Sequence, residues 1–151
     1  MAFQSSSDHN LLRFLTAQES TYDVALSEIT RGKKQSHWMW FIFPQIQGLG
    51  FSETSKRYAV KDLRKAEAFM THLLLGNRLV TICEVLMQNK NNDAYSIFGS
   101  PDDMKLLSCM TLFSSVKNAH PFYRSCSEVF WRCKRWENVT HYQCRNLVSY
   151  L

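Results

Sequence analysis

Apolar residues recur every three or four positions along most of the chain, which is the spacing of amphipathic helices. Only three prolines and five glycines are present, and they fall between the apolar-periodic segments. A sheet protein with many turns uses more of both residues. The pattern predicts helices or helical turns over residues 8–18, 20–32, 52–58, 61–72, 74–88, 93–99, 101–118, 121–136 and 140–151. We therefore expect an all-α fold, a compact bundle of about seven or eight short helices.

Several of these segments begin or end with residues that favour helix termini. Asp8 is a candidate N-cap of the first helix, and Gly32 suits the end of the second. Asp93 is placed to cap the short turn that follows it. The clearest start signal is SPDD at residues 100–103, which offers a serine N-cap, a proline at the first helical position and two acids near the positive end of the helix dipole.

The sequence SHWMWFIFPQ, residues 36–45, is harder to assign. Its composition suits a buried strand as well as a helical turn. A strand needs a partner, and the sequence offers no second convincing strand. We therefore expect a helical turn capped by Ser36, with an irregular extended segment over residues 37–43 as the alternative. The residues expected in the core are Met39, Phe41, Ile42 and Phe43.

Chain length and composition limit the classes of protein to consider. The chain has 151 residues, so we expect one domain over residues 1–151, with residues 1–7 disordered. Hydrophobic residues make up 45% and aromatic residues 13%, which is enough to fill a core. No run of 18 apolar residues is present, and the N-terminus lacks the pattern of a secretory signal. These features predict a cytoplasmic or nuclear protein without a membrane span.

The cysteines and the net charge bear on which metals, cofactors and partners to expect. The five cysteines form no CxxC pair, which argues against zinc and favours their use as small apolar fillers. We expect no metal and no cofactor. The net charge of +5 permits an anionic partner, but the basic residues are spread out, so duplex nucleic acid is not favoured. The oligomeric state stays open.

Three polar side chains fall at positions where a plain core would be apolar. Lys105 lies on the inward arc of the helix after Pro101, and Asp102 is one turn away. Lys105 either extends to water at the helix end or meets a partner or ligand. Gln18 lies on an apolar face, where its amide holds a loop carbonyl or contacts a ligand. His37 is either a core-edge histidine bound to a backbone carbonyl or a proton-transfer group.

Four tryptophans are many for a chain of this length. Indole faces stack on nucleobases and other flat rings, and nearby cations bind phosphates. A plain core also uses tryptophan, and Gly48-Leu49-Gly50 is only a weak phosphate-loop pattern. The residues by themselves therefore leave core filling and ring binding both open.

Four strings occur in order along the chain: RFLTAQ (13–18), GKKQSHWMWFIFPQIQGLG (32–50), IFGSPDDMKL (97–106) and SCMTLF (108–113). Together they resemble the family catalogued as domain of unknown function 1810, over about residues 11–130. The resemblance implies a mainly α-helical domain and no established activity. It also implies a shared set of polar residues, which among aromatic neighbours is typical of a pocket. The set is Arg13, Gln18, Lys34, His37, Gln45, Asp102, Lys105, Ser108 and Thr111.

The chain departs from this family near its C-terminal end. The family usually carries an aspartate and a glycine-containing turn before its last helix. Here the stretch reads FWRCKRWENVTHYQC over residues 130–144, and Glu137 is only a loose substitute for the aspartate. A family role of that acid is therefore in doubt for this chain.

We hypothesise a small-molecule pocket where residues 33–45 meet the first helix and the helix after Pro101. The expected ligand is anionic and flat, similar to a nucleotide. We expect Trp38 or Trp40 to stack on it and Lys34 and Lys105 to bind its charge. The predicted ligand-binding residues are Arg13, Gln18, Lys34, Trp38, Trp40, Gln45, Ser108 and Thr111.

The sequence leaves open whether the protein is an enzyme. If it is, we expect His37 to transfer the proton, with Asp102 or Asp103 as an orienting partner or a metal contact. Lys105 is the third candidate catalytic residue. The reaction would take place at a phosphate- or ribose-linked bond. The rival hypotheses are a non-catalytic adaptor that binds another protein and a binder of single-stranded nucleic acid.

Overall fold

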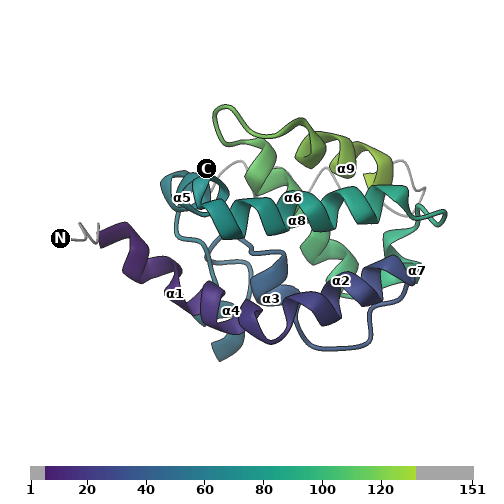
Figure 1. The fold of residues 1–151 in the computed structure, drawn as a ribbon, viewed down its shortest axis with the longest axis horizontal. Helices are drawn as coiled ribbons and strands as arrows, with labels where there is room; N and C mark the ends of the chain where they lie inside the picture. Colours follow the sequence, from purple (N-terminus) through teal and green to yellow (C-terminus); the bar gives the residue numbers. More distant parts are fainter. Residues whose placement is uncertain (1–5, 132–151) are drawn as a thin grey trace.

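The structure, a computed structural model, describes residues 6–131, and this part of the chain is built from helices (Figure 1). They are α1 (Ser6–Glu19), α2 (Tyr22–Thr30), α3 (Met39–Ile42), α4 (Glu53–Arg57), α5 (Leu63–Thr71), α6 (Leu73–Gln88), α7 (Ala94–Phe98), α8 (Asp102–Ser114) and α9 (Pro121–Trp131). The described residues contain no strand, only an isolated parallel bridge between Ile46 and Val60. The predicted all-α class is therefore confirmed.

The segment at residues 37–43 forms a helical turn, as predicted, but Ser36 does not cap it. α3 begins after Trp38, and no side chain caps its first turn. The Ser36 hydroxyl instead donates to the carboxylate of Glu28, because a charged acceptor forms the stronger hydrogen bond. The prediction for Asp8 was also wrong, since α1 begins at Ser6 and Asp8 lies inside it.

The start of α8 differs from the prediction in one respect. Pro101 occupies the N-cap position, and no side chain, including that of Ser100, makes a capping hydrogen bond. The serine cap was therefore wrong, because the proline lies one position earlier than expected. Asp102 and Asp103 do occupy the first turn, where they face the positive end of the helix dipole.

Local hydrogen bonds explain the start of α7 and the end of α8. Asp93 caps α7 as predicted, with its carboxylate accepting from the N–H of Tyr95 at 3.2 Å. α8 ends at Ser114, four residues before the predicted end at 118. The hydroxyls of Ser114 and Ser115 both donate to the carbonyl of Thr111, and such bonds compete with continuation of the helix.

The core lies where α6 and α8 meet their neighbours. α6 packs against α2, α5 and α9, and α8 packs against α5, α7 and α9 (Figure 1). Both helices direct apolar side chains inward, and burial of that surface is the main force that holds a helical bundle together. The four residues of 36–45 that were expected in the core, namely Met39, Phe41, Ile42 and Phe43, are all buried.

Three cysteines belong to this core. Cys83, Cys109 and Cys126 are buried and unoxidised. A side-chain hydrogen bond with Cys126 and burial raise the pKa of the Cys83 thiol, and burial raises the pKa of Cys109. Their predicted use as small apolar fillers is confirmed.

The segment after α3 runs beside the segment after α4. The N–H of Gln47 donates to the carbonyl of Val60 at 2.7 Å, and the N–H of Val60 donates to the carbonyl of Gln45 at 2.8 Å. The Phe41 ring packs on Tyr58, with centroids 5.2 Å apart. These contacts place residues 45–50 against α4 and its C-terminal end.

Some predictions concern residues outside this description. They are the disorder at residues 1–5, the end of the 121–136 helix, the last helix at 140–151, and the role of Glu137. Ser6 and Ser7, which were also expected to be disordered, lie in α1. Among residues 6–131, no single helix is long and apolar enough to cross a membrane; α5 and α6 together reach that length and composition, but the chain bends by 89° between them.

Candidate functional site

A buried glutamate on α2 organises the loop that follows this helix. One carboxylate oxygen of Glu28 accepts from the backbone N–H of Gln35 at 2.8 Å, from that of Ser36 at 3.1 Å and from Nε1 of Trp38 at 2.8 Å. Its other oxygen accepts from the Ser36 hydroxyl. Burial by itself would raise the pKa of Glu28, but these hydrogen bonds outweigh it and lower the pKa to about 2. Glu28 is therefore ionised at neutral pH and holds residues 35–38 against α2.

A chain reversal brings this loop back over α2. Gly32 has φ +76°, in the left-handed region that glycine adopts readily, and its N–H donates to the carbonyl of Ile29 at 2.9 Å. The N–H of Lys34 then donates to the carbonyl of Ile97 at 2.7 Å. The loop is thereby tied to α7 and lies next to the first turn of α8.

Lys34, Asp102 and Lys105 form one ion-pair cluster, named here the lysine cluster. Nζ of Lys34 lies 2.8 Å from one carboxylate oxygen of Asp102, and Nζ of Lys105 lies 2.9 Å from the other. Burial acts to raise the pKa of Asp102, but the two lysines overcome it, so the pKa is lowered. The expectation that Asp102 lies within reach of Lys105 is confirmed.

Each lysine of the cluster also lies over an indole ring. Nζ of Lys34 is 5.1 Å from the ring centroid of Trp38, and Nζ of Lys105 is 4.7 Å from that of Trp40. Both distances are within the range of cation–π attraction. Trp38 is fully buried and bonded to Glu28, so the predicted stacking role was wrong for this residue. Trp40 is partly exposed, and its stacking role stays a prediction.

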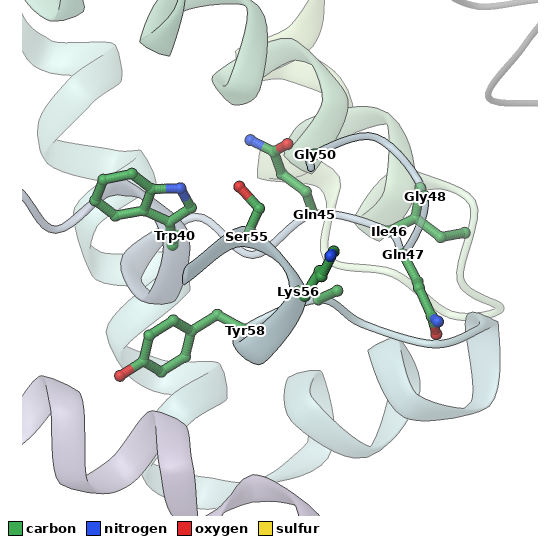
Figure 2. A pocket seen from close by; sticks show the side chains of 10 residues that line it. Trp40, Gln45, Ile46, Gln47, Gly48, Gly50, Ser55, Lys56 and Tyr58 are labelled. Carbon is green, nitrogen blue, oxygen red and sulfur yellow. The ribbon is translucent and has the colours of Figure 1, made fainter. Parts of the chain in front are cut away.

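Trp40 forms one wall of a narrow cleft of about 60 Å³, named here the Trp40 cleft (Figure 2). Its other walls come from the turn after Pro44 and from α4. Figure 2 shows the side chains of Trp40, Gln45 and Ser55 on the same side of this cleft. Nε2 of Gln45 is buried and has no hydrogen-bond partner among the described residues. An unpaired buried N–H costs about 1–3 kcal/mol, so this amide is the group in the cleft with most to gain from a ligand.

Close backbone packing keeps the Trp40 cleft narrow. A Cβ atom at Gly50 would lie 2.5 Å from the Cβ of Ser55, so only glycine allows the turn to approach α4 this closely. Ser52 caps α4 by accepting from the N–H of Ser55 at 3.1 Å. The shape of the cleft is thus set by a glycine turn packed on a capped helix.

Two predicted ligand residues on α1 have other partners. Nε2 of Gln18 donates to the carbonyl of Phe41 at 2.7 Å, which confirms that this buried amide holds a backbone carbonyl. Nη2 of Arg13 donates to the carbonyl of Ala59 at 3.1 Å. Arg13 also lines a second hollow, next to the Trp40 cleft.

Two hydroxyls on α8 are bonded within their own helix. Ser108 donates to the carbonyl of Met104 at 3.1 Å, and Thr111 donates to that of Leu107 at 2.8 Å. Such bonds satisfy a hydroxyl on a helix without any further partner. The polar character of Ser108 and Thr111 is therefore explained by α8 itself.

His37 is not brought to the lysine cluster. Its side chain is exposed, and within residues 6–131 no hydrogen bond or ion pair joins it to Lys34, Asp102 or Lys105. Asp103, the alternative orienting acid, is buried and accepts from the N–H of the residue after it. The structure thus gathers the lysine cluster and Trp40 but leaves His37 outside, and its catalytic role stays a prediction.

Glu28 is the main residue of this region that was not predicted from the sequence to have a role. A signal was present, because Glu28 shares the inward face of α2 with Tyr22, Ala25 and Ile29, all of which are buried. An acid on an apolar face must find donors, and a serine and two tryptophans follow within twelve residues. The partner donors themselves were not predictable, since they depend on the chain reversal at Gly32.

Comparisons with known proteins agree with this fold. The chain matches the model of a family described as protein of unknown function (DUF1810) over residues 8–142, which confirms the resemblance. It is also similar to the crystal structure of the conserved hypothetical protein Rv1873 from Mycobacterium tuberculosis, with a TM-score of 0.79 and 36% sequence identity. That match covers 87% of this chain and 94% of the other. No curated protein matches the chain.

Proposed function

The chain belongs to the DUF1810 family, and we propose that it binds a small anionic molecule with a flat ring, similar to a nucleotide, at the Trp40 cleft. One observation carries this proposal: the buried amide nitrogen of Gln45 has no hydrogen-bond partner among the described residues and lies in the wall of this cleft. The ammonium group of Lys105 lies over the Trp40 ring, which adds a cation beside the same cleft.

The lysine cluster supports an anionic ligand. Lys34 and Lys105 contribute two positive charges and Asp102 one negative charge, so the cluster carries an excess of one positive charge. An incoming anion can replace one of the two contacts of Asp102 without leaving that carboxylate unpaired. Such an exchange avoids the large penalty of a buried charge that has lost its only partner.

The size of the cleft limits how much of the ligand enters it. Sites that enclose a whole small molecule have volumes of about 300–1,000 Å³. The Trp40 cleft has about 60 Å³, so it admits one edge of a ring or one polar group. The edge that enters would accept a hydrogen bond from Gln45, and the rest of the ligand would lie across Trp40 and outside the cleft.

Binding is better supported than catalysis. Of the three residues predicted to be catalytic, Asp102 and Lys105 hold each other in an ion pair. The lowered pKa of Asp102 makes it a poor proton donor at neutral pH. His37 is exposed and has no partner in the lysine cluster within the described residues. A hydrolytic or transfer reaction at a phosphate- or ribose-linked bond therefore stays a secondary hypothesis.

The test is a binding screen against AMP, ADP-ribose and ribose phosphate, followed by calorimetry on the best ligand. We expect the ligand to raise Tm by roughly 5 °C at about 100 times its Kd. Gln45→Met and Lys105→Met should each weaken binding by about tenfold, because each removes one polar contact. Gln45→Met should also raise the stability of the free protein, since it removes an unpaired buried amide.

Gln88→Met is the matched control for this screen, because Gln88 is exposed and does not line the Trp40 cleft. It makes the same chemical change and should leave binding intact. Unchanged affinity of both Gln45→Met and Lys105→Met would reject the assignment of the site. Absence of binding by all three ligands would reject a nucleotide-like ligand.

A protein-interaction role is the second candidate, and one observation favours it. Phe51, at the end of the glycine turn beside the Trp40 cleft, is 88% exposed. A large exposed aromatic side chain is typical of an anchor in protein interfaces. If no small molecule binds, Phe51→Ser is the variant with which to test capture of a protein partner.

A further inference from the structure

A second hollow of about 370 Å³ lies next to the Trp40 cleft and shares Gln47, Lys56 and Ala59 with it. We name it the basic groove, because five of its described lining residues are cations and none of these described residues is an acid. Its volume falls in the range of about 300–1,000 Å³ that is usual for small-molecule sites. The five cations are Arg13, Lys56, Arg57, Lys61 and Lys65.

Three parts of the chain bring these cations together. Lys56 and Arg57 come from the last turn of α4, and Lys61 and Lys65 flank the start of α5. Arg13 comes from α1 and donates to the carbonyl of Ala59, between these two helices. The bridge at Val60 fixes the connection, so the positions from which the cations project are set by backbone hydrogen bonds.

Four of the five cations are hardly neutralised within the described residues, namely Lys56, Arg57, Lys61 and Lys65. Lys56 has an ion pair with Glu53 at 3.4 Å, but both side chains are more than half exposed, and such pairs are weak. For Arg57, Lys61 and Lys65 no ion pair is present within residues 6–131. A concave surface lined by charges of one sign concentrates the electric field and attracts counter-ions.

The acid that lies among these cations in sequence, Asp62, already accepts a hydrogen bond. Asp62, between Lys61 and Lys65 in sequence, caps α5 by accepting from the N–H of Lys65 at 3.0 Å. It does not line the groove. The apolar side chains of Leu11 and Phe14 form part of the floor, which leaves the cations as the groups that select a ligand.

We propose that the basic groove binds a chain of phosphate groups, and that these phosphates belong to the same ligand whose ring lies at the Trp40 cleft. The second part rests on the proposed function, and it narrows the ligand class to nucleotides with two or more linked phosphates. Lysine and arginine together bind phosphate oxygens through charge-assisted hydrogen bonds. Figure 2 shows Gln47 at the far end from Trp40 and Lys56 between them, and both residues line both hollows.

The first experiment uses inorganic tripolyphosphate and isothermal titration calorimetry. The groove variant is Arg57→Gln/Lys61→Gln/Lys65→Gln. The control variant, Arg31→Gln/Lys90→Gln/Lys117→Gln, removes the same charges from exposed positions outside both hollows. We expect the wild type and the control to bind alike within about twofold and the groove variant to bind at least about tenfold more weakly. Equal affinity of the two variants would overturn the proposal.

The second experiment asks whether ring and phosphates belong to one ligand. We expect ATP to bind the wild type more tightly than tripolyphosphate, and Trp40→Leu to remove this difference while tripolyphosphate binding persists. Equal binding of ATP and tripolyphosphate in both proteins would leave the groove as a phosphate site. It would reject a ring site at the Trp40 cleft and a ligand shared by the two hollows. Much tighter, steeply salt-dependent binding of a single-stranded oligonucleotide would overturn the proposal in favour of a nucleic-acid strand.

Discussion

Two carboxylates contact the loop at residues 33–38 and are used in contrasting ways. Glu28 accepts hydrogen bonds from backbone, hydroxyl and indole donors of residues 35–38. Asp102 accepts from the ends of two lysine side chains. Both carboxyls have lowered pKa values, so charge alone does not distinguish them.

The difference lies in what each donor can do. Three of the four donors to Glu28 cannot leave without disrupting the loop, because they belong to the backbone and to the buried Trp38 ring. The lysines that contact Asp102 are long, flexible side chains that can turn to another anion. We infer that Glu28 fixes the shape of the loop, whereas Asp102 holds two cations in place until a ligand competes for them.

The largest effect is expected for Glu28→Ala. This change leaves two backbone N–H groups and Nε1 of Trp38 without their acceptor. We expect a loss of roughly 3–5 kcal/mol in the free energy of unfolding, measured by urea denaturation. Glu19→Ala, at an exposed acid of α1, is the control and should cost about 0.5 kcal/mol or less. A loss below about 1 kcal/mol for Glu28→Ala would contradict the role of Glu28 in holding residues 35–38 against α2.

The same carboxyl should give a pH dependence of stability in acid. The pKa of Glu28 is about 2 in the folded protein, against a reference value of 4.5. Because the folded value is the lower one, the stabilisation is complete above about pH 4.5 and is lost as the pH falls towards 2. The stability difference between the wild type and Glu28→Gln should therefore shrink over this interval, as measured by urea midpoints.

Asp102→Asn provides the comparison for that pH experiment. The lowered pKa of Asp102 also favours the folded state above its range of titration, but it does not affect the contribution of Glu28. An Asp102→Asn protein should therefore keep the decline between pH 4.5 and about 2. If the stability of Asp102→Asn did not fall over this pH interval, the pH dependence would belong to Asp102 and not to Glu28.

A smaller effect on stability, and an opposite effect on binding, is expected for Asp102→Asn at neutral pH. Two largely buried lysines lose their shared counter-charge, which should cost about 2 kcal/mol, between the values typical of exposed and of fully buried pairs. The same change frees the Lys105 ammonium and leaves Lys34 with only the Ser36 carbonyl, so the affinity for AMP should rise. Calorimetry measures both proteins under the same salt conditions, and weaker binding by the variant would show that Asp102 itself contacts the ligand.

The smallest effect is expected for His37→Ala. The side chain is exposed and lies outside the lysine cluster, so the free energy of unfolding should change by about 0.5 kcal/mol or less. The affinity for AMP should change by less than about twofold. Loss of binding in this variant would restore His37 to the site and reopen the catalytic hypothesis.

Features that depend on neighbours in sequence could be predicted. Lys105 and Asp102 are one helical turn apart, and Asp93 caps the turn that begins directly after it. Gln18 on an apolar face had to bind something, and it holds a backbone carbonyl. The helical repeat determined the contact of Lys105, and the position next to a helix start determined that of Asp93. For Gln18 the repeat showed only that its amide faces inward, and the fold supplied its partner, the Phe41 carbonyl.

Features that depend on a fold-back of the chain could not be predicted. Ser36 was expected to cap α3 because its neighbours in sequence suggested nothing else, yet Glu28 competes for its hydroxyl across the reversal at Gly32. Likewise, the Trp40 cleft arises from the approach of Gly50 to Ser55 and from the bridge at Val60. No local pattern reveals which distant segments will meet.

The three buried thiols can report on transient opening of the helical core. Only the thiolate reacts with alkylating reagents, and the raised pKa values of Cys83 and Cys109 keep these groups protonated as well as enclosed. Modification therefore has to wait until α6 and α8 separate. The rate at which iodoacetamide labels these two positions would measure how often the whole bundle opens, without any engineered cysteine.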